Sequence, residues 1–380
     1  MVLNGIDCID RYDHLFKGKK VALLTSVTGL DRNLKSTISI LHKRYGLVAL
    51  FGPEHGVRGD GAAGEDVGDY IDEETGVQVY SLYKNASKHL TKEQMGLFDV
   101  LVYDIQDVGT RFYTFISTLC YVIEDLAAYG KELVILDRIN PLDGVTVEGS
   151  LLDDDYRSFV GAYNLPVRYG LTCGELATMI NAENNYGCNI TVVKCEGWER
   201  KMQFPDTGLL YVMPSSGLPS FNSMLVYPGT CFIEGTNVSE GRGTTTPFEM
   251  LGAPFINATE FAEAMNEKKL PGVIFRPVYF TPTTSKHEGE LCKGIQLHIT
   301  DRHSYKSVVT GFEILYELMG RYKTDFEYLP AYREGGRPFI DLLFGNRFVW
   351  KIPPKEALFE RFEKDSKEFV RRKQEFHLYK

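Results

Sequence analysis

Three short polar segments combine acidic and basic side chains with turn-forming glycine and proline. They are Gly52-Pro-Glu-His-Gly-Val-Arg-Gly59, Gln106-Asp-Val-Gly-Thr-Arg-Phe-Tyr113 and Asp137-Arg-Ile-Asn-Pro-Leu142. Each follows an apolar run, at residues 47–51, 100–105 and 133–136 respectively. In an open parallel sheet, ligands bind beyond the carboxyl ends of the strands. We therefore expect the three segments to meet at one edge of a sheet and to form a ligand site there.

Glu54 is the first candidate for chemistry in these segments. It comes directly after an apolar strand and is flanked by glycine and proline. A carboxyl group held against an apolar wall can have a raised pKa, which is what a general acid requires. A structural role is equally compatible with the sequence, since Glu54 could cap a helix or pair with Arg58. His55 is a candidate for orienting the carboxylate or for binding substrate, although a single histidine is more often structural.

Asp107 and Arg111 lie four residues apart where a helix is expected to begin. An aspartate is expected there simply as a cap, because it accepts hydrogen bonds from free backbone N–H groups. Arg111 is the better functional candidate, since a guanidinium can bind a carboxylate at two points. Asp137 and Arg138 either bind substrate or form an ion pair with each other, and both interpretations stay open.

A fourth polar segment, residues 232–244, carries Glu234, Asn237, Glu240 and Arg242 among three glycines. A solvated flexible loop is one interpretation. The apolar residues that lead into it and its glycine content favour an ordered ligand-binding loop. The sequence has no Gly-x-Gly-x-x-Gly after its first strand, no Walker loop and no Gly-x-Ser-x-Gly, which argues against dinucleotide, nucleoside triphosphate and esterase sites.

The elements that must position these segments alternate between strands and helices in the first half of the chain. The expected strands are residues 20–25, 47–51, 100–105, 133–136 and 189–194, and the expected helices are residues 36–45, 112–129 and 172–184. This alternation predicts an α/β fold with a parallel sheet that is covered on both faces.

The second half has a different pattern. Residues 204–256 are rich in Gly, Pro, Ser and Thr, and we expect a long ordered loop region. An α+β pattern follows, with expected elements at residues 259–269, 273–280, 294–300 and 305–321 and a helix from about 355. We expect a Rossmann-like α/β domain with long cleft loops over residues 1–250 and a smaller α+β C-terminal domain over residues 251–380.

Composition excludes several classes of function. The 380 residues carry a net charge of −9, which argues against nucleic acid or an anionic membrane as the main partner. No apolar run approaches the ~20 residues of a membrane-spanning helix. Seven cysteines without a Cys-x-x-Cys pair and eight histidines without a His-x-x-x-His pair predict no metal site and no cofactor. The first residues show no export signal, so the sequence is compatible with a cytoplasmic protein or with a signal that has been removed.

The polar segments resemble the hallmark motifs of the NamZ/YbbC family. The matching stretches are residues 51–59, 104–114, 140–142, 234–244 and 340–345, together with the C-terminal Arg-Arg-Lys…Leu-Tyr. The resemblance extends from about residue 6 to the end of the chain. This sequence departs from the family pattern at Val27 and Ile139, where the family usually has proline.

The resemblance implies an exo-β-N-acetylmuramidase that removes N-acetylmuramic acid from the non-reducing end of peptidoglycan fragments. It also implies a Rossmann-like domain, a smaller C-terminal domain and an active site in a cleft between them. Glu54 matches the catalytic glutamate proposed for the family. The second catalytic carboxylate is one of a set of glutamates in or near the matching segments: Glu124, Glu148, Glu234 and Glu240.

The substrate-binding candidates are the other polar side chains of the same segments: His55, Arg58, Arg111, Tyr113, Asp137, Arg138, Asn140, Asn237 and Arg242. The expected partners are peptidoglycan-derived saccharides, and the expected location is periplasmic or secreted, with a cytoplasmic location as the alternative. Two other functions stay open: a non-catalytic protein that binds muropeptides, and a cytoplasmic enzyme that acts on an acidic sugar or a nucleotide. The sequence leaves the oligomeric state and the stereochemical course open.

Recognition of muramic acid calls for a cation. Muramic acid differs from N-acetylglucosamine by a lactyl ether, whose carboxylate is ionised at neutral pH. An arginine offers a fork that matches a carboxylate at two points. The candidates are Arg58, Arg111 and Arg242, and we favour Arg242, with Arg111 second.

The absence of metal-ligand spacing gives a first testable prediction. Exhaustive chelation should leave the hydrolysis of a chromogenic N-acetylmuramic acid glycoside unchanged, because no His, Cys or carboxylate cluster has the spacing of a metal site. The measurement is kcat before and after chelation. Activity that disappears on chelation and returns with one added metal would refute this expectation.

Overall fold

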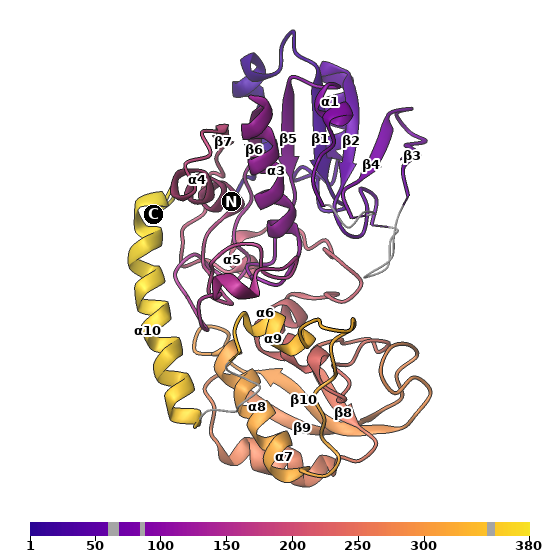
Figure 1. Cartoon of the computed structure of the whole chain (residues 1–380), viewed down its shortest axis with the longest axis vertical. Helices are drawn as coiled ribbons and strands as arrows, with labels where there is room; N and C mark the ends of the chain where they lie inside the picture. Colours follow the sequence, from indigo (N-terminus) through magenta and orange to yellow (C-terminus); the bar gives the residue numbers. More distant parts are fainter. Residues whose placement is uncertain (60–67, 84–87, 348–353) are drawn as a thin grey trace. The chain divides into compact units, whose positions relative to one another are not determined.

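The structure is a computed structural model that describes residues 1–59, 68–83, 88–347 and 354–380 (Figure 1). The chain forms two compact units. Unit 1 comprises Met1–Thr146, Gly170–Ser216 and Arg371–Lys380, and unit 2 comprises Val147–Tyr169 and Gly217–Val370. The domain division expected at residue 250 stays a prediction; it differs from these units in the assignment of residues 147–169, 217–250 and 371–380.

Unit 1 is built on a sheet of seven strands in the order β3-β4-β2-β1-β5-β6-β7. The strands are β1 (Val21–Thr25), β2 (Leu47–Gly52), β3 (Tyr70–Ile71), β4 (Gln78–Ser81), β5 (Val100–Asp104), β6 (Glu132–Leu136) and β7 (Asn189–Val193). All pairs are parallel except β3 with β4. The predicted Rossmann-like sheet is confirmed, and all five expected strands are present.

Helices cover both faces of this sheet, as expected. The helical elements of unit 1 are η1 (Gly5–Leu15), α1 (Thr37–Tyr45), α2 (Lys92–Met95), α3 (Phe115–Tyr129), α4 (Cys173–Glu183), α5 (Phe204–Thr207) and η5 (Gln374–Phe376). The apolar side chains of η1 and α1 form one buried cluster with alternate residues of the central strands. Figure 1 shows α3 running alongside β5 and β6.

Two helix boundaries illustrate the local signals. Helix α1 begins after Ser36, whose side chain accepts a hydrogen bond from the backbone N–H of Ile38, and ends at Gly46 in a left-handed conformation. Helix α3 also ends at a left-handed glycine, Gly130, but it begins at Phe115 and not at residue 112. The expected start was too early because the residues before Phe115 form a turn that carries polar side chains.

Unit 2 contains an antiparallel sheet with the strand order β8-β10-β9. Its elements are η2 (Asp154–Tyr156), α6 (Phe221–Thr230), η3 (Cys231–Gly235), β8 (Met250–Ala253), α7 (Ala258–Glu267), β9 (Val273–Phe280), β10 (Cys292–Ile299), α8 (Ser307–Arg321), α9 (Phe339–Phe344) and most of α10 (Lys355–Lys373). The elements expected after residue 257 are all present, so the predicted α+β character is confirmed.

The prediction of a long loop region over residues 204–256 was wrong. The segment contains α5, α6, η3 and β8. Helix α6 was missed because Pro228 and Gly229 lie inside it, and both residues normally indicate a loop. Of the helices that the structure describes, none has the length and apolar character needed to cross a membrane.

A close contact between two helix backbones explains one of these glycines. A Cβ atom at Gly229 of α6 would lie 1.9 Å from the carbonyl oxygen of Ser307, and a Cβ at Gly311 of α8 would lie 2.1 Å from the carbonyl oxygen of Gly229. No side chain fits at either position. Helices α6 and α8 can therefore pack this closely only with glycine at both positions.

This contact gives a second prediction. Gly311→Ala should lower the free energy of unfolding by roughly 1–3 kcal/mol, because an added methyl group forces α6 and α8 apart. The measurement is urea or thermal unfolding of the full chain. Gly320→Ala is the matched control, since Gly320 lies in the same helix and a Cβ there meets nothing within 4 Å. The control should be neutral or stabilise by up to about 1 kcal/mol; equal losses at the two glycines would contradict the explanation.

Candidate active site

Four loops of unit 1 meet at the carboxyl edge of the parallel sheet. The loop after β2 contacts the loop after β5, because Thr114 Oγ1 donates a hydrogen bond of 2.6 Å to Glu54 Oε2. The loop after β5 contacts the loop after β6, because Gln106 Nε2 donates to the carbonyl oxygen of Ile139 at 2.9 Å. The loop after β1 lies against the loop after β2, since a Cβ on Gly59 would come within 2.9 Å of Val27. The expected convergence of the polar segments is therefore confirmed.

Glu54 is half-buried in this edge. Its hydrogen-bond donor, Thr114, directly precedes α3, so the carboxyl group is tied to the start of a helix. The next residue, His55, is buried and has a φ of 75°, a conformation that residues with a side chain rarely adopt. Strain of this kind is concentrated at functional sites, where the surrounding structure enforces it. The ring of His55 meets that of Phe115 edge to face at 6.4 Å.

Arg58 takes a different partner from the one considered in the sequence. Its guanidinium binds Asp72 through Nε at 2.9 Å and Nη2 at 2.8 Å, and it also binds Glu74 at 2.9 Å. Burial raises the pKa of Asp72, but hydrogen bonds from Thr75 and Arg58 outweigh this and hold it below its ordinary value. The proposed pair of Arg58 with Glu54 is therefore replaced by this cluster.

The turn between β5 and α3 does not contain the helix cap that the sequence predicted. Asp107 does not cap α3; its Oδ2 accepts a hydrogen bond of 2.6 Å from the backbone N–H of Gly109. The expectation was wrong because α3 begins eight residues after Asp107. Arg111 is fully buried and Tyr113 is 7% exposed, and burial raises the pKa of the Tyr113 hydroxyl. Gly109 has a φ of 77°, and a Cβ there would lie 2.6 Å from Asn140 Oδ1.

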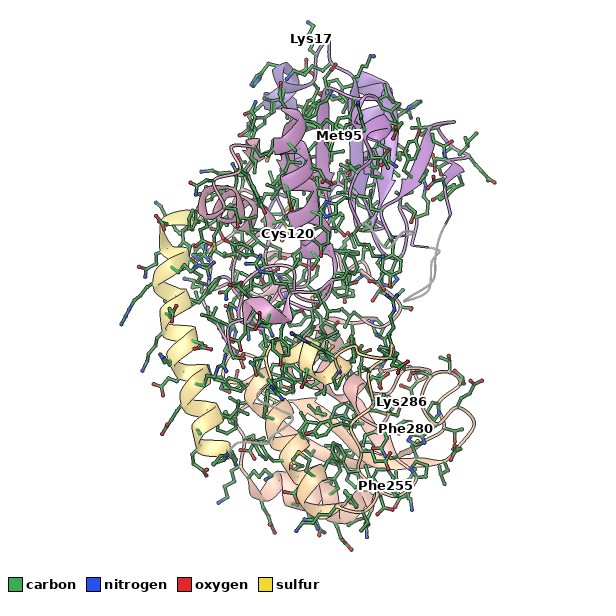
Figure 2. All side chains as sticks on the ribbon, viewed as in Figure 1. Lys17, Met95, Cys120, Phe255, Phe280 and Lys286 are labelled. Carbon is green, nitrogen blue, oxygen red and sulfur yellow. The ribbon has the colours of Figure 1, made fainter. Side chains whose placement is uncertain are left out.

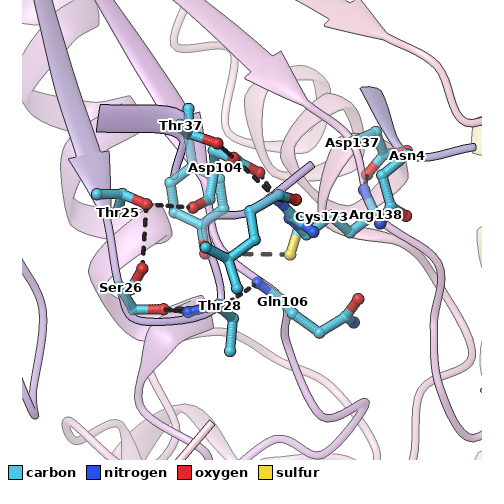
Figure 3. Close-up of polar contacts among 12 residues, drawn as sticks. Asn4, Thr25, Ser26, Thr28, Thr37, Asp104, Gln106, Asp137, Arg138 and Cys173 are labelled. Atoms are coloured by element: carbon cyan, nitrogen blue, oxygen red, sulfur yellow. Dashed lines mark hydrogen bonds and ion pairs between the residues drawn. The ribbon is translucent and has the colours of Figure 1, made fainter. Parts of the chain in front are cut away.

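Arg138 forms a buried ion pair, but with Asp104 and not with Asp137. Arg138 Nε donates to Asp104 Oδ1 at 2.6 Å and Nη2 donates to Oδ2 at 3.0 Å (Figure 3). Thr37 Oγ1 also donates to Asp104 Oδ2, at 2.5 Å. Asp104 was missed as a site residue, although it is the one charged residue at the end of the apolar run Val-Leu-Val-Tyr-Asp.

Asp137 instead organises the loop after β6. It accepts hydrogen bonds from Thr172 Oγ1 at 2.7 Å, from the backbone N–H of Gly174 at 2.8 Å and from the Tyr379 hydroxyl at 2.5 Å. Burial raises the pKa of Asp137 to about 6, against the opposing effect of these donors. Asn140 is buried too, and its amide donates to the carbonyl oxygen of Leu171. Asp137 and Asn140 therefore hold the backbone at Gly174 and Leu171 in place.

The glycine-rich segment of unit 2 forms a network of charges. Arg242 Nε donates to Glu234 Oε1 at 2.8 Å and lies 3.4 Å from Glu240 Oε1. Lys286, in the loop between β9 and β10 (Figure 2), lies 2.8 Å from Glu240 Oε2 and donates to the carbonyl oxygens of Ile233 and Thr236. This segment is thus an ordered loop. Lys286 was missed because nothing in the sequence links residue 286 to residue 240.

The charges in this network are mutually balanced. Burial lowers the pKa of Arg242, but Glu234 and Glu240 outweigh this effect and raise it above its ordinary value. The Glu240 side chain is 2% exposed and the Glu234 side chain is 16% exposed. Asn237 ties the same loop to residues 325–327, because its amide donates to the carbonyl oxygen of Asp325 and accepts from the backbone N–H of Glu327.

The other two candidate carboxylates are in different surroundings. Glu124 is exposed in the middle of α3, ten residues after Thr114 and therefore ~15 Å along the helix from the start that holds Glu54. Glu148 is buried in unit 2, where it pairs with Arg168 at 3.0 Å and accepts from the backbone N–H of Val308. The structure does not bring Glu124 to Glu54, and Glu148 is occupied by a structural pair.

All seven cysteines are buried free thiols. Within the described ranges, no group of three or more His, Cys, Asp or Glu side chains is placed to hold a metal ion.

Known proteins match the chain along its whole length. A model of the N-terminal part of the exo-β-N-acetylmuramidase NamZ matches residues 21–222, and a model of its C-terminal part matches residues 225–379. The peptidoglycan β-N-acetylmuramidase NamZ of Bacillus subtilis (strain 168) is 46% identical over 385 residues, which cover 100% of this chain and 91% of that protein.

Two crystal structures of DUF1343 family proteins from Bacteroides fragilis NCTC 9343 share the fold. One has a TM-score of 0.91 and 37% identity, and the other has a TM-score of 0.77 and 29% identity. Each comparison covers 100% of this chain and 99% of the other. With both family models matched and a full-length relative at 46% identity, the chain belongs to the exo-β-N-acetylmuramidase NamZ family.

Proposed function

We propose that this protein is an exo-β-N-acetylmuramidase that releases N-acetylmuramic acid from the non-reducing end of peptidoglycan fragments. The observation that carries the proposal is the 46% identity, over the full chain, with a peptidoglycan β-N-acetylmuramidase. A carboxyl group at the carboxyl edge of an α/β sheet supports it, because glycoside cleavage generally uses a pair of such groups.

Glu54 is the proposed general acid, which protonates the glycosidic oxygen as the bond breaks. The role requires a carboxyl group with a defined position. The 2.6 Å hydrogen bond from Thr114 supplies this, because Thr114 is itself fixed at the start of α3. The strained backbone of His55 beside it supports the same assignment.

Glu234 is the proposed second carboxylate, ahead of Glu240. Both lie beside Arg242, but Glu240 is also paired with Lys286 and is almost completely buried. Glu234 keeps the greater exposure of the two, 16% of its side chain. A group that assists attack at the sugar must be reachable by substrate or water, so the more exposed carboxylate is the better candidate.

The proposed substrates are peptidoglycan-derived saccharides. We also propose a periplasmic or secreted location, because peptidoglycan lies outside the cytoplasmic membrane. A non-catalytic muropeptide-binding protein is the competing hypothesis. Turnover of a chromogenic N-acetylmuramic acid glycoside decides between the two, since a binding protein would retain the glycoside unchanged.

Replacing the proposed acid gives a third prediction. Glu54→Gln should lower kcat on the chromogenic glycoside by ~10²–10⁴-fold, which is the usual contribution of a general acid or base. The fold should persist, because Glu54 is a loop residue and not part of the core. The measurement combines steady-state kinetics with the thermal unfolding midpoint.

Glu93→Gln is the matched control for this variant. Glu93 is exposed on α2 in the same unit, so the same change there should leave kcat unaltered. A Glu54→Gln enzyme with nearly wild-type kcat would show that the acid is another group.

A fourth prediction concerns the lactyl carboxylate. We propose that Arg242 binds it, because the Arg242 side chain is 28% exposed and its Nη1 makes no hydrogen bond to any residue that the structure describes. Arg111 is fully buried and is less suited. Arg242→Gln should lower kcat/KM for the N-acetylmuramic acid glycoside by about tenfold more than for the N-acetylglucosamine glycoside, since one charge-assisted contact is lost.

Arg321→Gln serves as the control, because Arg321 is also paired with two glutamates, Glu260 and Glu317, and its side chain is 32% exposed. It should leave both kcat/KM values unchanged. Equal losses of kcat/KM on the two glycosides in Arg242→Gln would mean that Arg242 stabilises its loop or the transition state and does not bind the lactyl carboxylate.

A further inference from the structure

The strand order of unit 1 defines a switch point between β1 and β5. The chain leaves β1 toward β2 and β4 on one side of the sheet, then crosses to β5, β6 and β7 on the other. The loops after β1 and β5 therefore diverge, and ligands of open α/β sheets bind in the crevice that this leaves. Three polar side chains lie there: Ser26 and Thr28 after β1, and Gln106 after β5 (Figure 3).

The side-chain hydroxyls of Ser26 and Thr28 form a hydrogen-bonded pair. Ser26 Oγ and Thr28 Oγ1 lie 2.8 Å apart, so one of the two O–H groups donates to the other. Both oxygens also accept a backbone N–H, from Thr28 at 3.3 Å and from Gln106 at 3.0 Å. The second hydroxyl hydrogen has no acceptor among the residues that the structure describes. The pair therefore retains one O–H donor.

The Gln106 side chain offers a hydrogen-bond acceptor, where the hydroxyl pair offers a donor. Its Nε2 donates to two backbone carbonyl oxygens, of Asp107 at 2.8 Å and of Ile139 at 2.9 Å, so both amide hydrogens are used. These two bonds fix the orientation of the amide, and the side chain is 9% exposed. No donor within the described part of the chain reaches its Oε1. The side chain thus holds one oriented acceptor.

We propose that Ser26, Thr28 and Gln106 form a subsite for the 2-acetamido group of the sugar. This inference rests on the proposed function. An acetamido group carries one N–H donor and one carbonyl acceptor, and in a planar trans amide these point in opposite directions. Gln106 Oε1 accepts from the N–H, and the hydroxyl pair donates to the carbonyl oxygen. Figure 3 shows the Gln106 side chain extending away from Thr28, so the amide and the hydroxyl pair lie on opposite sides of the Gln106 backbone N–H.

The same loops bring this subsite to the proposed acid. Val27, between the two hydroxyl residues, contacts the loop that follows Glu54 at Gly59. Gln106 and Thr114 belong to one loop, and Thr114 binds Glu54. A sugar held by its acetamido group at the switch point would therefore lie in the part of unit 1 that carries Glu54.

The test compares two chromogenic glycosides that both carry the lactyl ether and differ only at C2, one with an acetamido group and one with a hydroxyl. The measured quantity is the ratio of their kcat/KM values. The double variant Ser26→Ala/Thr28→Val, which removes both hydroxyls, and the single variant Gln106→Met should each lower this ratio roughly three- to tenfold, the effect of losing one neutral hydrogen bond to substrate. Thr28→Ser, which keeps its hydroxyl, should leave the ratio near that of the wild type.

Ser36→Ala is the matched control. Ser36 Oγ also accepts one backbone N–H, from Ile38 at 3.2 Å, but it caps α1 and lies outside the switch point, so the ratio should not change. Equal losses on both glycosides in Ser26→Ala/Thr28→Val and Gln106→Met would overturn the subsite while leaving the proposed function intact. If the wild type hydrolyses neither glycoside, the proposed function and the subsite both fail. Should either of these variants not fold, the other decides.

Discussion

The buried ion pair between Asp104 and Arg138 is the interaction on which the site in unit 1 depends. Neither side chain is appreciably exposed, and two N–H···O bonds join them. Removing one partner of such a pair leaves an uncompensated buried charge, which typically costs about 3–5 kcal/mol. The pair joins the end of β5 to the start of the loop after β6. Thr37 and the carbonyl oxygen of Leu30 extend it to the segment after β1.

The Asp104–Arg138 ion pair explains how loops that contain many turn-forming residues make an ordered site. With the ends of β1, β5 and β6 joined, the polar loops beyond them have little freedom, and short contacts between loops complete the arrangement. Gln106 reaches Ile139, and Thr114 reaches Glu54. The site is thus prepared before substrate arrives, so little ordering entropy opposes binding. A general acid also benefits, because its efficiency depends on a position held to a fraction of an ångström.

Unit 2 uses charge in a different way. Glu234, Arg242, Glu240 and Lys286 form a chain of alternating acidic and basic side chains in a partly buried loop. Each charge has an opposite neighbour, so desolvation is compensated locally. Lys286 additionally binds two backbone carbonyls of the same loop. These contacts order the glycine-rich segment in spite of its composition, and Arg242 Nη1 is the nitrogen that we propose for binding the lactyl carboxylate.

Sequence alone determined the features that depend on local pattern. Apolar runs predicted five strands of the unit 1 sheet, strand–helix alternation predicted that the sheet is parallel, and the switch-point rule placed Glu54 with the loops after β5 and β6. Which charged side chains pair with one another was decided only by the tertiary structure. Arg138 pairs with Asp104 and not with its neighbour Asp137, and Lys286 reaches Glu240 from a loop 46 residues away in sequence. Helix α6 was not predicted because it contains Pro228 and Gly229. The need for Gly229 becomes clear only from its close packing against α8. The physical reason is common to all three: an ion pair or a close backbone contact depends on distances in space, which local sequence does not encode.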